Sequence, residues 1–276
     1  MSKKNIVVVG AGFAGVAAAK KLSRHFKKNP DVLITLIDKH SYQTYMTELH
    51  EVAAGRVQPD AIQYDLQRLF SRSRNVDIIT DEVTHVDREK KVVTTSSHSF
   101  NYDYLILAMG GEPNTFNVPG VDEHAFTMWS CEDANKIRRH IKDTVEAAAK
   151  EHDDAKRKAM LTAVVSGAGF TGVELVGELM EWKDKLAKDN KLDPAEFSLY
   201  LVEAAPQILG VVTEKEQQKA EKYMLKKGIQ IIKGNGVANV KKDSVELSDE
   251  TVIPTHTMIW TAEVKANYDA ATNGIE

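Results

Sequence analysis

The chain lacks residues on which several classes of protein depend. Its 276 residues contain a single cysteine, Cys131, which excludes an intrachain disulfide and a cysteine-rich zinc site. A lone cysteine is also typical of a reducing compartment. No apolar run reaches the roughly 20 residues that cross a bilayer. Lysine and arginine total 36 against 40 acidic residues, a net charge of −4, so the basic excess usual in nucleic-acid-binding proteins is absent.

The remaining composition is that of a folded protein with two domains. Hydrophobic residues make up 42% of the chain and charged residues 28%, which excludes a wholly disordered chain. A domain usually takes about 150 residues, so the length predicts two. The longest apolar run, residues 6–19, contains patterned glycines and no convincing cleavage site, which favours a strand and helix over a signal peptide.

The sequence repeats itself at a spacing of 157 residues. Residues 7–16 align with residues 164–173, and both copies read as strand, glycine turn, helix, strand, β-meander and a final apolar strand. We therefore predict an α/β fold with two Rossmann-like dinucleotide-binding domains, each with a small β-meander. The predicted boundaries are 1–117, 118–258, and 259–276 as the start of a return to the first domain. Ser130 and Asp133 have the spacing of a helix capping box, which predicts a connecting helix.

Each copy contains the pattern G-x-G-x-x-G directly after a strand and at the start of a helix. The first glycine permits a tight turn, the second lets the backbone approach a pyrophosphate, and the third lets helix and strand pack closely. The helix N-terminus offers free N–H groups and a partial positive charge. The predicted phosphate-binding residues are Gly10, Gly12, Phe13, Ala14 and Gly15 in the first copy, and Gly167, Gly169, Phe170, Thr171 and Gly172 in the second.

A carboxylate ends the next strand of each copy, where a ribose would lie. Asp38, with its neighbour Lys39, is assigned to the first site, and Glu203 to the second. Because a carboxylate accepts hydrogen bonds from ribose hydroxyls and repels a 2′-phosphate, Glu203 favours NADH over NADPH. Two dinucleotide sites in one chain suggest a flavoprotein that is reduced by a nicotinamide.

The segment 41–55, where disulfide reductases carry a redox cysteine pair beside the flavin, has no cysteine. This excludes a dithiol relay and the cysteine-dependent sulfide:quinone chemistry. Electrons must therefore leave the flavin directly.

The same segment resembles a known family. Thr44-Tyr45-Met46 followed by Leu49 to Gly55 resembles the T-Y-x(4)-H-E-V-A-x-G stretch of type II NADH dehydrogenases. Gly167 to Leu175 is similar to their NADH motif, and Trp260-Thr261-Ala262 to their W-T-A-G strand. The resemblance implies a single-subunit, non-proton-pumping NADH:quinone oxidoreductase with FAD in the first domain, NADH in the second, and a quinone as electron acceptor.

The resemblance also implies roles for single residues. Glu174 would lie where nicotinamide and flavin meet and act in NADH binding and in electron or proton transfer to the quinone. Thr47, Val83, Ala108 and Gly110 would contact FAD. His50 and Glu51 could suggest a metal site, but adjacent residues on a helix point apart, so no metal is expected.

Two departures from the family pattern leave other functions open. Glu263 stands where the family commonly has glycine. The family also continues for roughly a hundred residues past Glu276, so we expect a truncated chain. The missing part would hold quinone-lining residues and a membrane-binding end. The full-length protein is expected to be cytoplasmic, peripheral on the inner face of the cell membrane, with a possible homodimer. The alternatives are a flavin reductase for an iron–sulfur protein and a catalytically inactive nucleotide-binding module.

Overall fold

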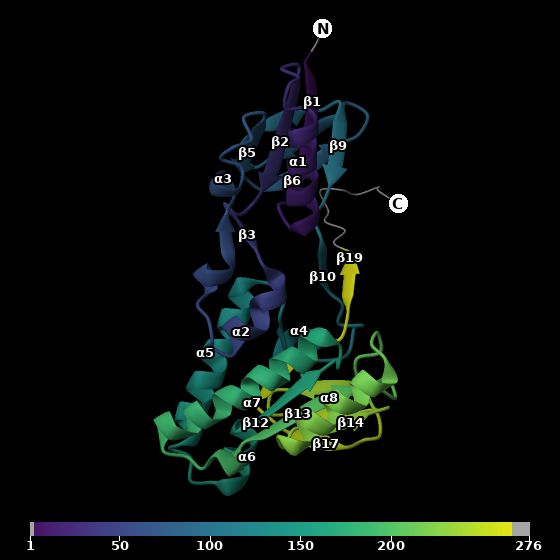
Figure 1. Ribbon diagram of the computed structural model, residues 1–276. Coiled ribbons are helices and arrows are strands. Elements are labelled where there is room, and N and C mark those ends of the chain that lie inside the picture. The colour runs from purple at the N-terminus through teal and green to yellow at the C-terminus, as the bar shows by residue number, and fades with distance from the viewer. Residues whose placement is uncertain (1–2, 267–276) are drawn as a thin grey trace. The chain divides into compact units, whose positions relative to one another are not determined.

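The computed structural model describes residues 3–266, and within them the chain forms two compact units (Figure 1). The first unit holds residues 3–45, 62–112 and 265–266, and the second holds 46–61 and 113–264. Residues 46–61 therefore lie with the second unit, although the predicted boundary assigned them to the first domain. Residues 267–276 of the predicted return segment lie outside the described residues.

The first unit is built on a four-stranded parallel sheet in the order β5-β2-β1-β9. Alternate residues of β1 face opposite sides, as the two-residue period of a strand requires. Ile6 and Val8 pack under α1 and α3, whereas Val7 and Val9 pack against the meander β6-β7-β8. The antiparallel strands β3 and β4 complete the unit. The bounds are β1 (Lys4–Val9), α1 (Phe13–His25), β2 (Val32–Asp38), β3 (Tyr42–Thr44), β4 (Gln63–Asp65), α3 (Leu66–Leu69), β5 (Val76–Thr80), β6 (Val83–Asp87), β7 (Val92–Thr95), β8 (Ser99–Asn101) and β9 (Tyr104–Leu107).

The second unit repeats this plan with a five-stranded parallel sheet in the order β11-β18-β12-β13-β14 and its own meander, β15-β16-β17. Its bounds are α2 (Leu49–Ala53), α4 (Val121–His124), β11 (Phe126–Thr127), α5 (Cys131–Ala148), α6 (Asp154–Met160), β12 (Thr162–Ser166), α7 (Phe170–Asn190), β13 (Ser198–Glu203), α8 (Glu214–Lys226), β14 (Gln230–Lys233), β15 (Val237–Lys241), β16 (Ser244–Leu247), β17 (Val252–Pro254) and β18 (Thr257–Trp260). The short strands β10 (Gly111–Pro113) and β19 (Val264–Ala266) pair where the chain passes between the units.

The predicted fold class is confirmed, and so is the start of the connecting helix. Ser130 Oγ accepts a hydrogen bond from the N–H of Asp133, and the Asp133 carboxylate accepts one from the N–H of Ser130. The polar segment after this helix holds a further helix, α6. It begins there because the Asp153 side chain caps its first N–H groups. In the described part of the chain, every helix is too short or too polar to span a bilayer.

Candidate nucleotide-binding site

The first glycine turn lies at the carboxyl end of β1 and is shaped by close backbone contacts. Gly10 has a φ of +95°, and a Cβ there would lie 2.3 Å from the Ala108 carbonyl oxygen. A Cβ on Gly15 would lie 1.8 Å from the carbonyl oxygen of Gly10. A Cβ on Gly12, by contrast, would meet nothing within 4 Å. Gly12 therefore leaves open space on the side from which a pyrophosphate would approach.

The second glycine turn has the same geometry at the carboxyl end of β12. Gly167 has a φ of +98°, and its Cβ would lie 2.5 Å from Cα of Ala262. A Cβ on Gly172 would lie 1.9 Å from the Gly167 carbonyl oxygen, whereas Gly169 again faces open space. The sequence repeat therefore extends to the atomic contacts of both turns.

The helices that follow the turns begin without a side-chain cap. Gly12 is the N-cap of α1 and Gly169 the N-cap of α7, and neither helix receives a side-chain hydrogen bond at its cap. The next residues of both helices are exposed: Phe13 and Ala14 in α1, and Phe170 and Thr171 in α7. Uncapped first-turn N–H groups and the positive end of the helix dipole form a site that suits phosphate oxygens.

The two carboxylates at the strand ends contact their own glycine turns. Asp38 Oδ2 accepts a hydrogen bond from the N–H of Ala11 at 2.6 Å, and Glu203 Oε2 accepts one from the N–H of Ala168 at 2.6 Å. The second oxygens accept from His40 N–H and Ala205 N–H, both at 2.8 Å. These bonds join residues 27 and 35 positions apart and could not be predicted from the local sequence. A carboxylate has about four acceptor positions, so each keeps capacity for ribose hydroxyls.

One cavity of about 160 Å³ in the first unit brings together several residues predicted to bind the first nucleotide. It is lined by Val9, Gly10, Ile37, Asp38, Lys39, His40, Asp81, Glu82, Val83 and Met109. The hydroxyl of Thr95 donates to Asp81 at 2.6 Å and lowers the pKa of that carboxyl. The cavity wall therefore carries the ionised carboxylate of Asp81, which suits the hydroxyl donors of a ribose better than a phosphate. Ala108 lies beside the first glycine turn, because its N–H donates to the carbonyl oxygen of Val9 at 2.7 Å. Gly110, two residues later, has a φ of +75°.

Glu174, the predicted catalytic residue, lies in the first part of α7, and its side chain is 47% exposed. His50 of α2 approaches it, with Nδ1 at 3.7 Å from Glu174 Oε2. Both residues line an open cavity of about 210 Å³, together with Glu178 on the next turn of α7. Glu174 is therefore accessible, and its neighbouring titratable groups come from α2 as well as from α7.

Helix α2 is held in the second unit by contacts that the sequence analysis missed. Gly55 ends the helix at a φ of +72°, and Arg56 N–H donates to the Glu51 carbonyl at 2.8 Å, a Schellman-type ending. This turn directs Arg56 at Glu178, with Nη1 and Oε1 2.5 Å apart, and the pair raises the pKa of Arg56. Glu178 is thus a structural ion-pair partner, and the glycine of the H-E-V-A-x-G stretch is explained by helix termination.

Two further predictions concern α2 and the turn just before it. Thr47, expected near FAD, is exposed in a single helical turn, Met46–Glu48, of the second unit. His50 and Glu51 do not point apart as predicted: Glu48, His50 and Glu51 each place one potential ligand atom within 4.8 Å of the others. Glu48 lies in the turn before α2, whereas His50 and Glu51 both belong to α2. That the chain holds no metal stays a prediction.

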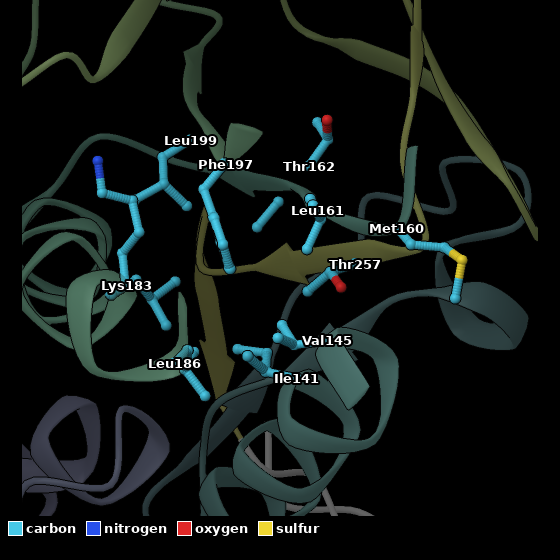
Figure 2. A pocket seen from close by; sticks show the side chains of 12 residues that line it. Ile141, Val145, Met160, Leu161, Thr162, Lys183, Leu186, Phe197, Leu199 and Thr257 are labelled. Carbon is cyan, nitrogen blue, oxygen red and sulfur yellow. The ribbon is translucent and has the colours of Figure 1, made fainter. Parts of the chain in front are cut away.

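A separate apolar pocket lies at the opposite end of the second sheet, where β12 and β13 begin (Figure 2). Its volume is about 30 Å³, which leaves room for about two water molecules. Lys183 contributes the charged side chain of its lining, which otherwise consists of Ile141, Val145, Met160, Leu161, Thr162, Ala163, Leu179, Leu186, Phe197, Leu199 and Thr257. The pocket is too small for a nucleotide or a quinone and lies away from the glycine turn.

Comparison with known proteins places these features in a family. Residues 4–276 match the model of the pyridine nucleotide-disulphide oxidoreductases. The chain belongs to this family. It is 32% identical over 270 residues to the type II NADH:quinone oxidoreductase of Staphylococcus saprophyticus and 33% identical to that of Staphylococcus haemolyticus, in each case over 96% of this chain. It spans 66% of the length of these relatives.

Solved structures of other proteins share the fold. The NDH2 enzyme of Plasmodium falciparum, solved in complex with NADH, superposes with a TM-score of 0.87 at 24% identity, over 96% of this chain and 56% of that one. The sulfide:quinone oxidoreductase of Aquifex aeolicus superposes with a TM-score of 0.76 at 20% identity, over 98% and 61%. Despite the family's name, the 276 residues contain one cysteine, buried at the start of α5, so no intrachain redox disulfide can form.

Proposed function

We propose that this protein is an FAD-dependent NADH:quinone oxidoreductase of the non-proton-pumping type. The observation that carries the proposal is the pair of matching dinucleotide turns, in a chain that is 32% identical over 96% of its length to type II NADH:quinone oxidoreductases. This level of similarity to named quinone reductases favours the proposal over a reductase for iron–sulfur proteins. The intact turns favour it over an inactive nucleotide-binding module.

In this proposal the first turn holds FAD and the second holds NADH. The N–H groups at the start of α1 and α7 bind the pyrophosphates, and Asp38 and Glu203 accept hydrogen bonds from riboses. Lys39 and Val83 line the FAD cavity, and Ala108 and Gly110 border it. When bound, FAD supplies the chemistry of accepting a hydride from NADH and passing two electrons to a quinone.

Glu174 is the residue proposed to handle protons. Reduction of a quinone by NADH consumes one proton from solvent in addition to the hydride of NADH. An exposed carboxylate beside the His50 imidazole, which is 14% exposed, can take a proton from solvent and release it again. Residues Thr47 and Glu174 belong to the same compact unit, and Thr47 stays a predicted flavin contact.

The proposal extends to location. A quinone is soluble in lipid, which supports peripheral attachment of the full-length protein to the inner face of the cell membrane. Self-association as a homodimer stays a prediction.

Anaerobic visible spectra of the purified chain, with FAD supplied, test the proposal. We expect bound flavin whose absorbance bleaches with NADH, far less with NADPH, and recovers when menadione is added. Failure to retain flavin, or bound flavin that NADH does not reduce, would contradict the proposal for this chain. Glu203→Gln is the matched control: it removes the negative charge that repels a 2′-phosphate, so NADPH should then bleach the flavin more readily.

A further inference from the structure

A strongly basic surface covers part of the first unit. No acidic residue occurs between Gly10 and Pro30, and the second half of α1 and the residues after it carry five lysines and arginines. Helix α3 and the turn after it add three arginines. We call these residues the basic face: Lys20, Lys21, Arg24, Lys27, Lys28, Arg68, Arg72 and Arg74. The whole chain has a net charge of −4, so this face differs sharply from the rest.

Several contacts hold the two stretches of the basic face side by side. Lys20 Nζ lies 5.8 Å from the centre of the Phe70 ring, just after α3. Ser23 Oγ donates to Asn75 Oδ1 at 2.7 Å, and Asn75 Nδ2 donates back to the Ser23 carbonyl at 3.3 Å. Both stretches also pack on the same side of the parallel sheet. The eight positive charges therefore share one surface.

The charges of the basic face are not neutralised within the described residues. None of the eight side chains forms an ion pair there, and all but Lys20 are exposed. The nearest acidic residues in sequence are Asp31, Asp65 and Asp77, and the Asp65 carboxylate instead accepts the N–H of Arg68 at 2.7 Å. Uncompensated like charges repel one another, so an external anion would stabilise this face.

The dinucleotide does not account for these charges. The glycine turn lies at the start of α1, and with a rise of about 1.5 Å per residue Arg24 lies about 18 Å further along the helix axis than Gly12. Charges at this distance are largely screened at physiological ionic strength, where the Debye length is about 8 Å. Only Arg24 and His25 lie in the last turn of α1, where they complement the helix dipole.

The residue types favour a lipid surface over a protein partner. Lysine is depleted in protein–protein interfaces, whereas clusters of about four to eight lysines and arginines are typical of surfaces that bind anionic lipids. An open groove of about 670 Å³ lies at the edge of the face, and its lining includes Tyr64, Arg68 and Arg72 together with Asp65, whose carboxylate accepts the N–H of Arg68. Tyr64 is 48% exposed, and tyrosine is enriched at membrane interfaces.

We propose that the basic face docks this protein on an anionic lipid bilayer, with a headgroup phosphate bound between Arg68 and Arg72. Arginine suits this position because its planar guanidinium pairs with phosphate oxygens in a bidentate manner. The surface belongs to the first unit of the described chain. Membrane attachment is also part of the proposed function, but docking through this face needs neither nucleotide nor quinone, so it is tested separately from the proposed reaction.

Co-sedimentation with vesicles tests the proposal. We expect the wild-type chain to bind phosphatidylglycerol–phosphatidylcholine vesicles, to ignore vesicles of phosphatidylcholine alone, and to dissociate as salt is raised. Each basic side chain near an anionic surface contributes about fivefold to the partition coefficient. The triple variant Lys27→Glu, Lys28→Glu, Arg72→Glu should therefore bind at least about a hundredfold more weakly.

The matched control changes three exposed lysines of α8 in the second unit. Lys219→Glu, Lys222→Glu, Lys226→Glu has the same net charge as the first variant and should bind like the wild type. Circular dichroism reports whether both variants fold. Equal losses in both variants, or no binding of the wild type to anionic vesicles, would overturn the proposal. Charge-dependent binding to poly-L-glutamate without vesicle binding would instead assign the face to an acidic protein.

Discussion

Alanine at Gly172 is expected to destabilise the second unit, whereas alanine at Gly169 is expected to weaken nucleotide binding. The two glycines are three residues apart in one turn, and their environments differ. A Cβ on Gly172 would lie 1.9 Å from the Gly167 carbonyl oxygen and 2.8 Å from Thr261 Oγ1. A Cβ on Gly169 would meet no protein atom within 4 Å, and this residue's φ of −72° and ψ of −171° are open to alanine.

The geometry sets the size of the first effect. Ordinary van der Waals contact with a Cβ begins at 3.4 Å, so the helix and the turn must separate by about 1.5 Å to accept a methyl group on Gly172. The neighbour is backbone and cannot rotate away. Overpacking typically costs about 1–3 kcal/mol, and a backbone contact this short places the cost at the upper end, about 3 kcal/mol. This is a large part of a stability of about 5–15 kcal/mol. For a unit of roughly 170 residues this lowers Tm by about 6–12 °C.

The second effect is one of ligand binding. Alanine at the N-cap position 169 costs the helix at most about 1 kcal/mol. Its methyl group, however, occupies the space through which a pyrophosphate reaches the N–H groups of α7. Losing two charge-assisted hydrogen bonds of about 1.5 kcal/mol each weakens NADH binding about a hundredfold.

Thermal unfolding followed by circular dichroism and NADH titration calorimetry separate the two variants. Gly12→Ala and Gly15→Ala form the corresponding pair in the first turn, with FAD as the ligand. If Gly172→Ala kept the wild-type Tm, the close contact would not exist in solution. If Gly169→Ala bound NADH normally, the open side of the turn would not be the phosphate site.

Two further predictions concern stability. Glu203→Ala leaves the Ala168 N–H without its acceptor and should lower the free energy of unfolding in urea by about 1–3 kcal/mol. Glu203→Gln keeps an acceptor oxygen and should lie closer to the wild type. Equal losses in the two variants would contradict this prediction. Burial lowers the pKa of His140 below 6.5, and its Nε2 donates to the His256 carbonyl at 2.9 Å. The unfolded chain therefore takes up the proton first as pH falls below 6.5, so the stability from His140 is complete above that pH and declines below it. Urea unfolding measured at a series of pH values gives the free energy of unfolding of the wild type and of His140→Gln. The difference between the two should decline below pH 6.5, and a difference that does not change with pH would refute the prediction.

Features that depend on short stretches of chain could be predicted from the sequence. The strands, the two glycine turns and the capping box at Ser130 are local, because each requires particular residues at fixed spacings along one element. The placement of Asp38 and Glu203 at strand ends follows from the same regularity. The repeat of 157 residues extended these local predictions to two domains of one fold class.

Features that depend on distant residues were decided by tertiary packing. Arg56 and Glu178 are 122 positions apart, and nothing in either local sequence indicates that α2 packs with the second unit. The contacts of Asp38 and Glu203 with backbone N–H groups also needed the fold, since they arise when a strand end meets a turn 27 or 35 residues earlier. The basic face likewise exists because the Ser23–Asn75 hydrogen bonds bring two charged stretches together. Residue identity therefore determined which groups were available, and only folding decided which of them face one another.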